Sequence, residues 1–183
     1  YGTTLDLAKP LYVKAGVDSE MDQLVADMNS GKVQALLIHG VNPSYSYGAS
    51  AKFNSGLGRV GLTVSFADRV DETAAGTTYL CPDHHYLESW NDSEAKAGSY
   101  SLTQPTIQPL FKTRQFQESL LKWAGNDSAY YDYIKANWAS IHTASSNAEM
   151  LFSDFFNTAL FNGVFDAEAE GAIVEFVGDV NAA

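Results

Sequence analysis

Apolar residues recur along the first half of the chain in two patterns, one typical of helices and one of buried strands. Apolar positions three or four apart between Met21 and Met28 predict a helix, and the Asn-Ser-Gly run that follows predicts its end. Three short apolar runs between turn residues predict strands that are buried on both faces. They lie at Val33–Gly40, Gly61–Phe66 and Thr78–Pro82. Because short helical segments are predicted between them, we expect a parallel sheet over residues 33–90.

The pattern changes after this α/β core. Residues 91–115 are mostly polar and include two prolines, so we expect a long loop that is functional or packs on a partner. Residues 116–163 contain three helical patterns, and residues 172–178 predict a final strand. We therefore expect an α/β fold in a single domain, residues 1–183, with an open, mainly parallel Rossmann-like sheet, flanking helices and a helical C-terminal portion.

Composition and charge exclude several classes of partner. The chain has 183 residues, of which 45% are hydrophobic, enough to form a sizeable core and to exclude general disorder. Its 22 acidic and 11 basic side chains give a net charge of −11, which argues against nucleic acid and anionic membrane surfaces as partners. No apolar segment approaches the roughly 18 residues of a membrane span, so we expect a soluble chain without direct membrane insertion.

The single cysteine and the first residue bear on the origin of the chain. Cys81 alone excludes an internal disulfide framework, a cysteine-ligated iron–sulfur cluster and a multi-cysteine zinc site in this chain. We expect its thiol to pack as a small apolar group. The chain begins at Tyr1 without a basic and apolar leader, so we expect a processed chain or a piece of a larger subunit.

The usual catalytic signatures are absent from the sequence, including G-x-S-x-G, the P-loop and H-E-x-x-H. The glycine-rich run at 56–61 precedes a predicted strand, whereas a dinucleotide-binding fingerprint follows one. His39 ends a predicted strand, so we expect a satisfied core histidine. His84 and His85 are adjacent and would point in opposite directions on an extended chain, which favours a structural or interface role. We assign no catalytic residue and no metal ligand.

The step after the first predicted strand carries the strongest sign of a binding site. Gly40 lets another backbone or a ligand approach closely, and Asn42-Pro43 would begin a helix whose N–H groups could meet an anion. Asp68 ends the next strand at the same sheet edge, where ligands of parallel sheets bind. Ordinary strand-to-helix turn chemistry explains the same residues, so both interpretations stay open.

The order of these motifs resembles that of the molybdopterin oxidoreductase family. In that family, a strand is followed by G-x-N-P and a second strand by Asp. An E-T-A turn comes next, then a short strand that ends in proline, and a Glu lies further along. The matching stretches are Ala35–Pro43, Val64–Asp68, Asp71–Ala74 and Tyr79–Glu88. Other stretches are similar to one branch, the large molybdopterin-oxidoreductase-like, iron–sulfur-binding subunit of bacterial alternative complex III, a quinol-oxidising respiratory complex. They are Pro82–Trp90, Tyr100–Phe111 and Glu118–Trp123.

This resemblance implies a set of cofactor-binding positions. In active members, the G-x-N-P turn would lie against the nucleotide of the molybdopterin guanine dinucleotide cofactor, with the strand-end acid and the E-T-A turn nearby. The candidate residues are Gly40, Asn42, Pro43, Asp68, Glu72 and Thr73. In the alternative complex III branch, the domain is thought to have lost the cofactor, so the resemblance implies that these positions are vestigial. Iron–sulfur clusters would lie elsewhere in the full subunit.

Three functional hypotheses follow. The first is a non-catalytic scaffold domain with no cofactor in this chain, in contact with other domains and subunits of a membrane-bound respiratory complex. The resemblance places that complex in the bacterial cell envelope, with this subunit on the periplasmic side of the inner membrane. The alternative is a fragment of an active molybdopterin oxidoreductase that contributes a nucleotide-binding crevice. The third is a secreted, acidic and aromatic-rich domain that binds a sugar or small molecule.

Overall fold

A computed structural model describes residues 9–13 and 16–167, and their contacts divide the chain into two compact units. The parallel-sheet unit comprises Gly16–Trp90 and Gln104–Asp132. The hairpin unit comprises Asn91–Thr103 together with the described residues before Gly16 and from Tyr133 onward. The expected single domain stays a prediction, because a division by contacts does not measure whether the units fold separately.

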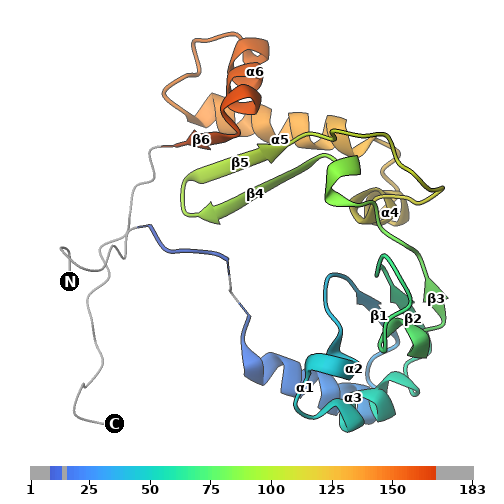
Figure 1. The fold of residues 1–183 in the computed structure, drawn as a ribbon. Coiled ribbons are helices and arrows are strands. Elements are labelled where there is room, and N and C mark those ends of the chain that lie inside the picture. Colours follow the sequence, from blue (N-terminus) through green and yellow to red (C-terminus); the bar gives the residue numbers. More distant parts are fainter. Residues whose placement is uncertain (1–8, 14–15, 168–183) are drawn as a thin grey trace, which may run out of the picture. The chain divides into compact units, whose positions relative to one another are not determined.

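Three parallel strands form the sheet of the parallel-sheet unit, in the order β1 (Ala35–Ile38), β2 (Leu62–Ser65) and β3 (Tyr79–Leu80) (Figure 1). Ala35 pairs with Leu62 and Ile38 with Ser65, so β1 and β2 end at the same edge. These strands confirm the predicted parallel sheet, whereas a wider Rossmann-like arrangement stays a prediction.

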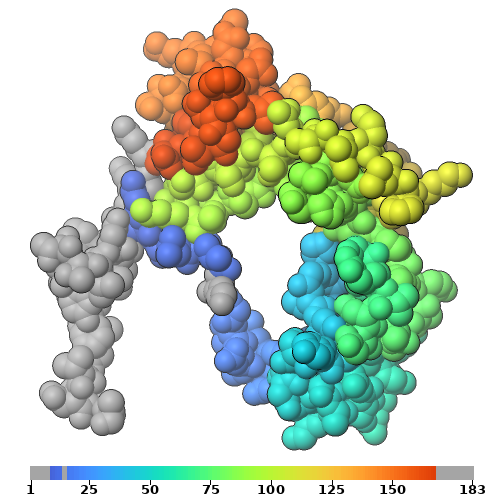
Figure 2. Space-filling model, in the orientation of Figure 1, coloured from blue at the N-terminus to red at the C-terminus, as the bar shows by residue number. Residues whose placement is uncertain are grey.

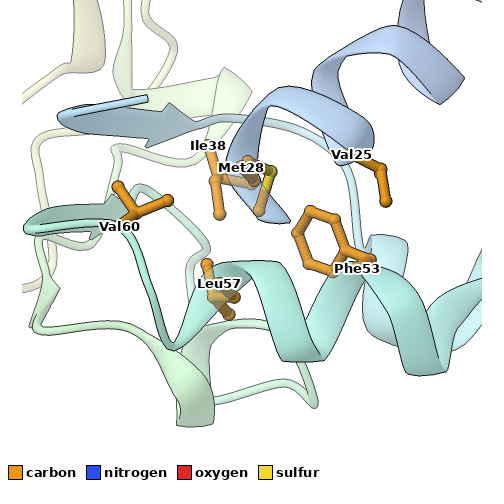
Figure 3. Packing of buried hydrophobic residues seen from close by; sticks show 6 residues of the cluster. All are labelled: Val25, Met28, Ile38, Phe53, Leu57 and Val60. Carbon is orange, nitrogen blue, oxygen red and sulfur yellow. The ribbon is translucent and has the colours of Figure 1, made fainter. Parts of the chain in front are cut away.

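Two helices cover β1 and enclose the hydrophobic core of this unit (Figure 3). They are α1 (Asp18–Asn29) and α3 (Ser50–Leu57), and both confirm helical segments predicted from the sequence. The buried core residues are Val25, Met28, Ile38, Phe53, Leu57 and Val60. Gly56 allows the two helices to approach closely, because a Cβ at this position would lie 2.9 Å from the Cβ of Met28. The core therefore fixes the position from which β1 leads into the next turn.

Shorter elements complete the parallel-sheet unit. The one-turn helix α2 (Pro43–Ser46) follows β1, and two 3₁₀ turns, η1 (Ala74–Gly76) and η2 (Tyr86–Glu88), flank β3. Helix α4 (Phe116–Trp123) confirms the first of the three predicted helices. The segment at 104–115 contains neither helix nor strand, in agreement with the predicted loop.

The loop prediction is wrong for residues 91–103, which form a hairpin. Strands β4 (Asn91–Lys96) and β5 (Ser99–Thr103) pair antiparallel, and β6 (Val164–Asp166) joins on the other side of β5. β4 consists mostly of polar residues, so its sequence lacks the apolar pattern that predicts a strand. Backbone pairing and cross-strand contacts stabilise it instead, among them a 2.8 Å hydrogen bond between the hydroxyls of Ser93 and Ser101.

Helices α5 (Tyr130–Ala144) and α6 (Phe152–Asn162) confirm the predicted helical portion. Trp138 on α5 is fully buried, and its ring lies near Phe155 and Phe156 of α6. Figure 2 shows the β4–β5 hairpin (yellow-green) against the segment of α6 and β6 (orange to red). The predicted strand at 172–178 lies outside the described residues. None of the helices within 9–13 and 16–167 is both long enough and apolar enough to cross a bilayer.

Candidate functional site

A crevice of about 380 Å³ opens in the parallel-sheet unit where β1 and β2 end. The sequence places ligand-binding candidates at this edge, and three of them line the crevice: Gly40, Asn42 and Asp68. The other three candidates, Pro43, Glu72 and Thr73, are not among the lining residues. The structure therefore brings the strand-end candidates together at one edge.

Gly40 begins the crevice directly after β1. Its φ angle is +66°, in the left-handed region that favours glycine, and a Cβ at this position would meet open space. The turn leads to Pro43, which is buried and occupies the first position of α2. The positive φ angle therefore requires a glycine here, although a side chain would have room.

Asn42 ties the G-x-N-P turn to the E-T-A turn through its side-chain amide. Its Nδ2 donates to Glu72 Oε2 at 2.7 Å, and its Oδ1 accepts from the hydroxyl and the N–H of Thr73, at 2.7 and 3.2 Å. Thr73 is fully buried. The bond from Asn42 lowers the pKa of Glu72 below its usual value, because it stabilises the carboxylate. These three candidates therefore form one hydrogen-bonded cluster, which we call the Asn42 cluster.

The start of α2 is not open to an anion, which corrects the expectation from sequence. Pro43 has no N–H group. The N–H of Ser44 donates to Thr73 Oγ1 at 3.0 Å, and that of Tyr45 donates to the carbonyl oxygen of Asn42 at 3.1 Å. The first N–H groups of this short helix are therefore satisfied within the protein.

Asp68 and Asp71 place two carboxylates in the crevice. Asp68 is paired in a bidentate manner with the guanidinium of Arg69, with a shortest distance of 2.7 Å, and this contact lowers the pKa of Asp68. Oδ1 of Asp71 accepts from the N–H of Ala74 at 2.7 Å and so holds the beginning of η1. Both side chains are therefore hydrogen-bonded within the protein.

Asp83 provides the third carboxylate and joins three segments around the crevice. Its Oδ2 lies 2.9 Å from Nε2 of His39, and its Oδ1 accepts from the N–H groups of His84 and Phe116. The imidazole of His39 also stacks on the ring of Phe116, with centroids 4.0 Å apart and planes 9° from parallel. The expectation of a buried core histidine at position 39 is wrong, because 41% of its side chain is exposed.

The neighbouring His84 and His85 both line the crevice, and the side chain of His85 also caps a turn. Nδ1 of His85 accepts from the N–H of Leu87, and Glu88 accepts from the N–H of His85, which forms a capping box on η2. This is a structural role of the kind predicted for the pair. Within the described part of the chain, no group of three or more His, Cys, Asp or Glu side chains is placed to hold a metal ion.

Comparison with known proteins supports the resemblance found in the motifs. No family model matches the chain. A curated relative, the menaquinone reductase molybdopterin-binding-like subunit of Nitratidesulfovibrio vulgaris, is 27% identical over 140 residues. The alignment covers 69% of this chain but 20% of the relative, so the chain spans about a fifth of that protein's length. The chain is therefore related to the molybdopterin oxidoreductases.

Among solved structures, acetylene hydratase from Pelobacter acetylenicus matches with a TM-score of 0.47 and 19% sequence identity. The match covers 57% of this chain and 15% of the hydratase chain.

The cofactor implied by the family does not fit the charges of this crevice. Molybdopterin guanine dinucleotide carries a pyrophosphate, which protein sites hold with free N–H groups, Lys or Arg. Of the described residues that line the crevice, none is Lys or Arg, and three are aspartates. The crevice can accept hydrogen bonds from a ligand, but its carboxylates would repel the negative charges of a pyrophosphate.

Proposed function

We propose that the chain is a molybdopterin-oxidoreductase-like domain with a scaffolding role in a subunit of a quinone-linked respiratory complex, and that it holds no cofactor. The observation that carries the proposal is the Asn42 cluster. The side-chain amide of Asn42 hydrogen-bonds to both Glu72 and Thr73, so motif residues that would serve a cofactor serve the fold.

The link to quinones draws on the curated relative, whose name describes a subunit of a menaquinone reductase. The finer assignment, to the quinol-oxidising alternative complex III branch, draws on the stretches Pro82–Trp90, Tyr100–Phe111 and Glu118–Trp123. It implies iron–sulfur clusters elsewhere in the full subunit. It also implies a position on the periplasmic side of the bacterial inner membrane.

Exposed apolar side chains support contact with other domains or subunits. In the segment at 104–115, Leu110 and Phe111 are 73% and 77% exposed. Large apolar side chains next to each other in water favour burial against a partner. The partners in this proposal are other domains of the same subunit and other subunits of the complex.

A second candidate function is a fragment of an active molybdopterin guanine dinucleotide oxidoreductase. The crevice favours it, because Gly40, Asn42 and Asp68 gather where β1 and β2 end, the usual ligand-binding edge of a parallel sheet. In that case Gly40 would allow the nucleotide to approach the backbone, and Asp68 would accept hydrogen bonds from it.

Metal and pterin analysis of the intact complex distinguishes the two functions. The complex would be purified from its natural membranes, analysed for molybdenum and tungsten by mass spectrometry, and denatured to release any fluorescent pterin. A molybdenum enzyme carried through the same steps is the control. We expect neither metal nor pterin in an amount equal to the subunit. One metal ion and one pterin cofactor per subunit would contradict the scaffold proposal and favour the enzyme.

A further inference from the structure

We infer that the crevice discriminates against anions, and that its aspartates keep phosphate-bearing ligands out at neutral pH. This inference rests on the proposed function, which it deepens by naming the property that excludes a dinucleotide. It concerns three carboxylates and the backbone N–H groups around them.

The charges in the crevice are unfavourable to a phosphate. Asp68, Asp71 and Asp83 contribute three negative charges, and no Lys or Arg is among the described lining residues. The guanidinium of Arg69 makes three hydrogen bonds to Asp68, so it offsets one of these three charges. Asp71 and Asp83 therefore leave an excess of negative charge in the crevice at neutral pH.

The protein's own carboxylates also occupy backbone donors of the kind that phosphate sites use. The N–H groups of His84 and Phe116 donate to Oδ1 of Asp83, at 2.7 and 2.8 Å. The N–H of Ala74 donates to Oδ1 of Asp71. Since a pyrophosphate would compete with a fixed carboxylate for each of these donors, the donors do not favour its binding.

Histidines are the remaining groups that could carry positive charge in the crevice. His39 is paired with Asp83 through Nε2, so any charge on His39 is matched by that carboxylate. Nδ1 of His85 accepts a hydrogen bond from the N–H of Leu87, so this nitrogen is already engaged within the protein. His84 also lines the crevice, together with the three aspartates.

The test measures binding of guanosine diphosphate and of pyrophosphate to the 183-residue chain at low ionic strength, by calorimetry and by NMR shifts of the backbone amides of Gly40 and Val41. Removing the charge of one carboxylate at about 8 Å from a dianion changes its affinity roughly tenfold. The double variant Asp68→Asn/Asp71→Asn should therefore bind guanosine diphosphate about 100-fold more tightly than the wild type, which should show no saturation at about 1 mM.

A matched control separates local charge from net charge. Glu149→Gln/Asp154→Asn removes two exposed carboxylates of the hairpin unit and should leave binding unchanged. Val41→Lys tests the same idea without breaking an internal hydrogen bond, because the Val41 side chain lines the crevice and is 60% exposed. It should also gain affinity, even if the double variant does not fold.

Two results would overturn the inference. One is saturable binding of guanosine diphosphate to the wild type with a Kd below about 100 μM, on the scale of an ordinary ligand site. The other is the absence of any gain in folded Val41→Lys and in the double variant. Either result leaves the scaffold proposal standing if the intact complex contains no pterin. Pterin in the complex overturns the scaffold proposal, whatever the isolated chain binds.

Discussion

The two units of the molecule reach stable sheets by different means. In the parallel-sheet unit, strands of apolar residues lie beneath helices, and the core is mainly aliphatic. In the hairpin unit, a polar strand, β4, pairs with β5, and the core centres on aromatic rings around Trp138. An apolar sequence pattern therefore defines the strands of the parallel-sheet unit, whereas pairing and packing define β4.

Buried polar contacts also differ between the units. In the hairpin unit, one bond is prominent, from Nε1 of Trp138 to Oδ2 of Asp92 on β4 at 3.0 Å. In the parallel-sheet unit, the Asn42 cluster links two turns with several bonds. Loss of a large ring should therefore destabilise the hairpin unit most, and loss of a hydroxyl should destabilise the parallel-sheet unit most.

The largest effect is expected for Trp138→Ala. The change leaves a cavity beside Phe155 and Phe156 and removes one hydrogen-bond donor to Asp92, so it should lower the free energy of unfolding by about 3–5 kcal/mol. Urea unfolding followed by circular dichroism measures this. The control, Phe161→Ala on α6, should change stability by about 0.5 kcal/mol or less, because Phe161 is 90% exposed.

Hydrogen exchange on the Trp138→Ala variant measures how each sheet responds to the loss of the ring. Amides of β4 and β5 should lose more protection than those of β1 and β2. Equal losses in both sheets would show one cooperative domain, as expected from the sequence. A loss of stability below about 1 kcal/mol would contradict the central role of Trp138.

The second prediction compares two threonines of the parallel-sheet unit. Thr73→Val removes the donor to Asn42 and the acceptor for the N–H of Ser44, so it should cost about 1–3 kcal/mol. Thr113→Val should be neutral within about 0.5 kcal/mol or slightly stabilising, because Oγ1 of Thr113 is buried without a hydrogen-bond partner in the described structure. Thermal unfolding of both variants gives the difference, and equal costs would exclude a special role for the Asn42 cluster.

The smallest effect concerns pH. Since the bond from Asn42 lowers the pKa of Glu72, the bond is fully present above the usual carboxyl pKa of about 4 and is lost as pH falls through the lowered value. The side-chain amide signals of Asn42 in NMR should therefore shift under acidic conditions, with little change in stability because Glu72 is exposed. In Glu72→Gln this shift should disappear, and its persistence would assign the titration to another group.

The sequence predicts the parallel-sheet unit well because its signals are local. The apolar runs of β1 and β2 and the turn residues after them lie next to each other in the chain, and so does the step from Gly40 to Pro43. The hairpin escapes prediction because β4 lacks an apolar pattern, and the side chain of Trp138 that contacts it lies 46 residues further along the chain. The pair of His39 and Asp83 escapes because 44 residues separate them, and neither motif stretch indicates by itself that the two side chains meet.

The burial of Trp138 gives the protein a built-in optical probe. Its ring is shielded from water and lies in the hairpin unit, whereas Trp90 and Trp123 lie in the parallel-sheet unit and are partly or largely exposed. Acrylamide should therefore quench the fluorescence of Trp90 and Trp123 readily and that of Trp138 weakly. The blue-edge emission would then report the state of one unit while the red edge reports the other, without any added label.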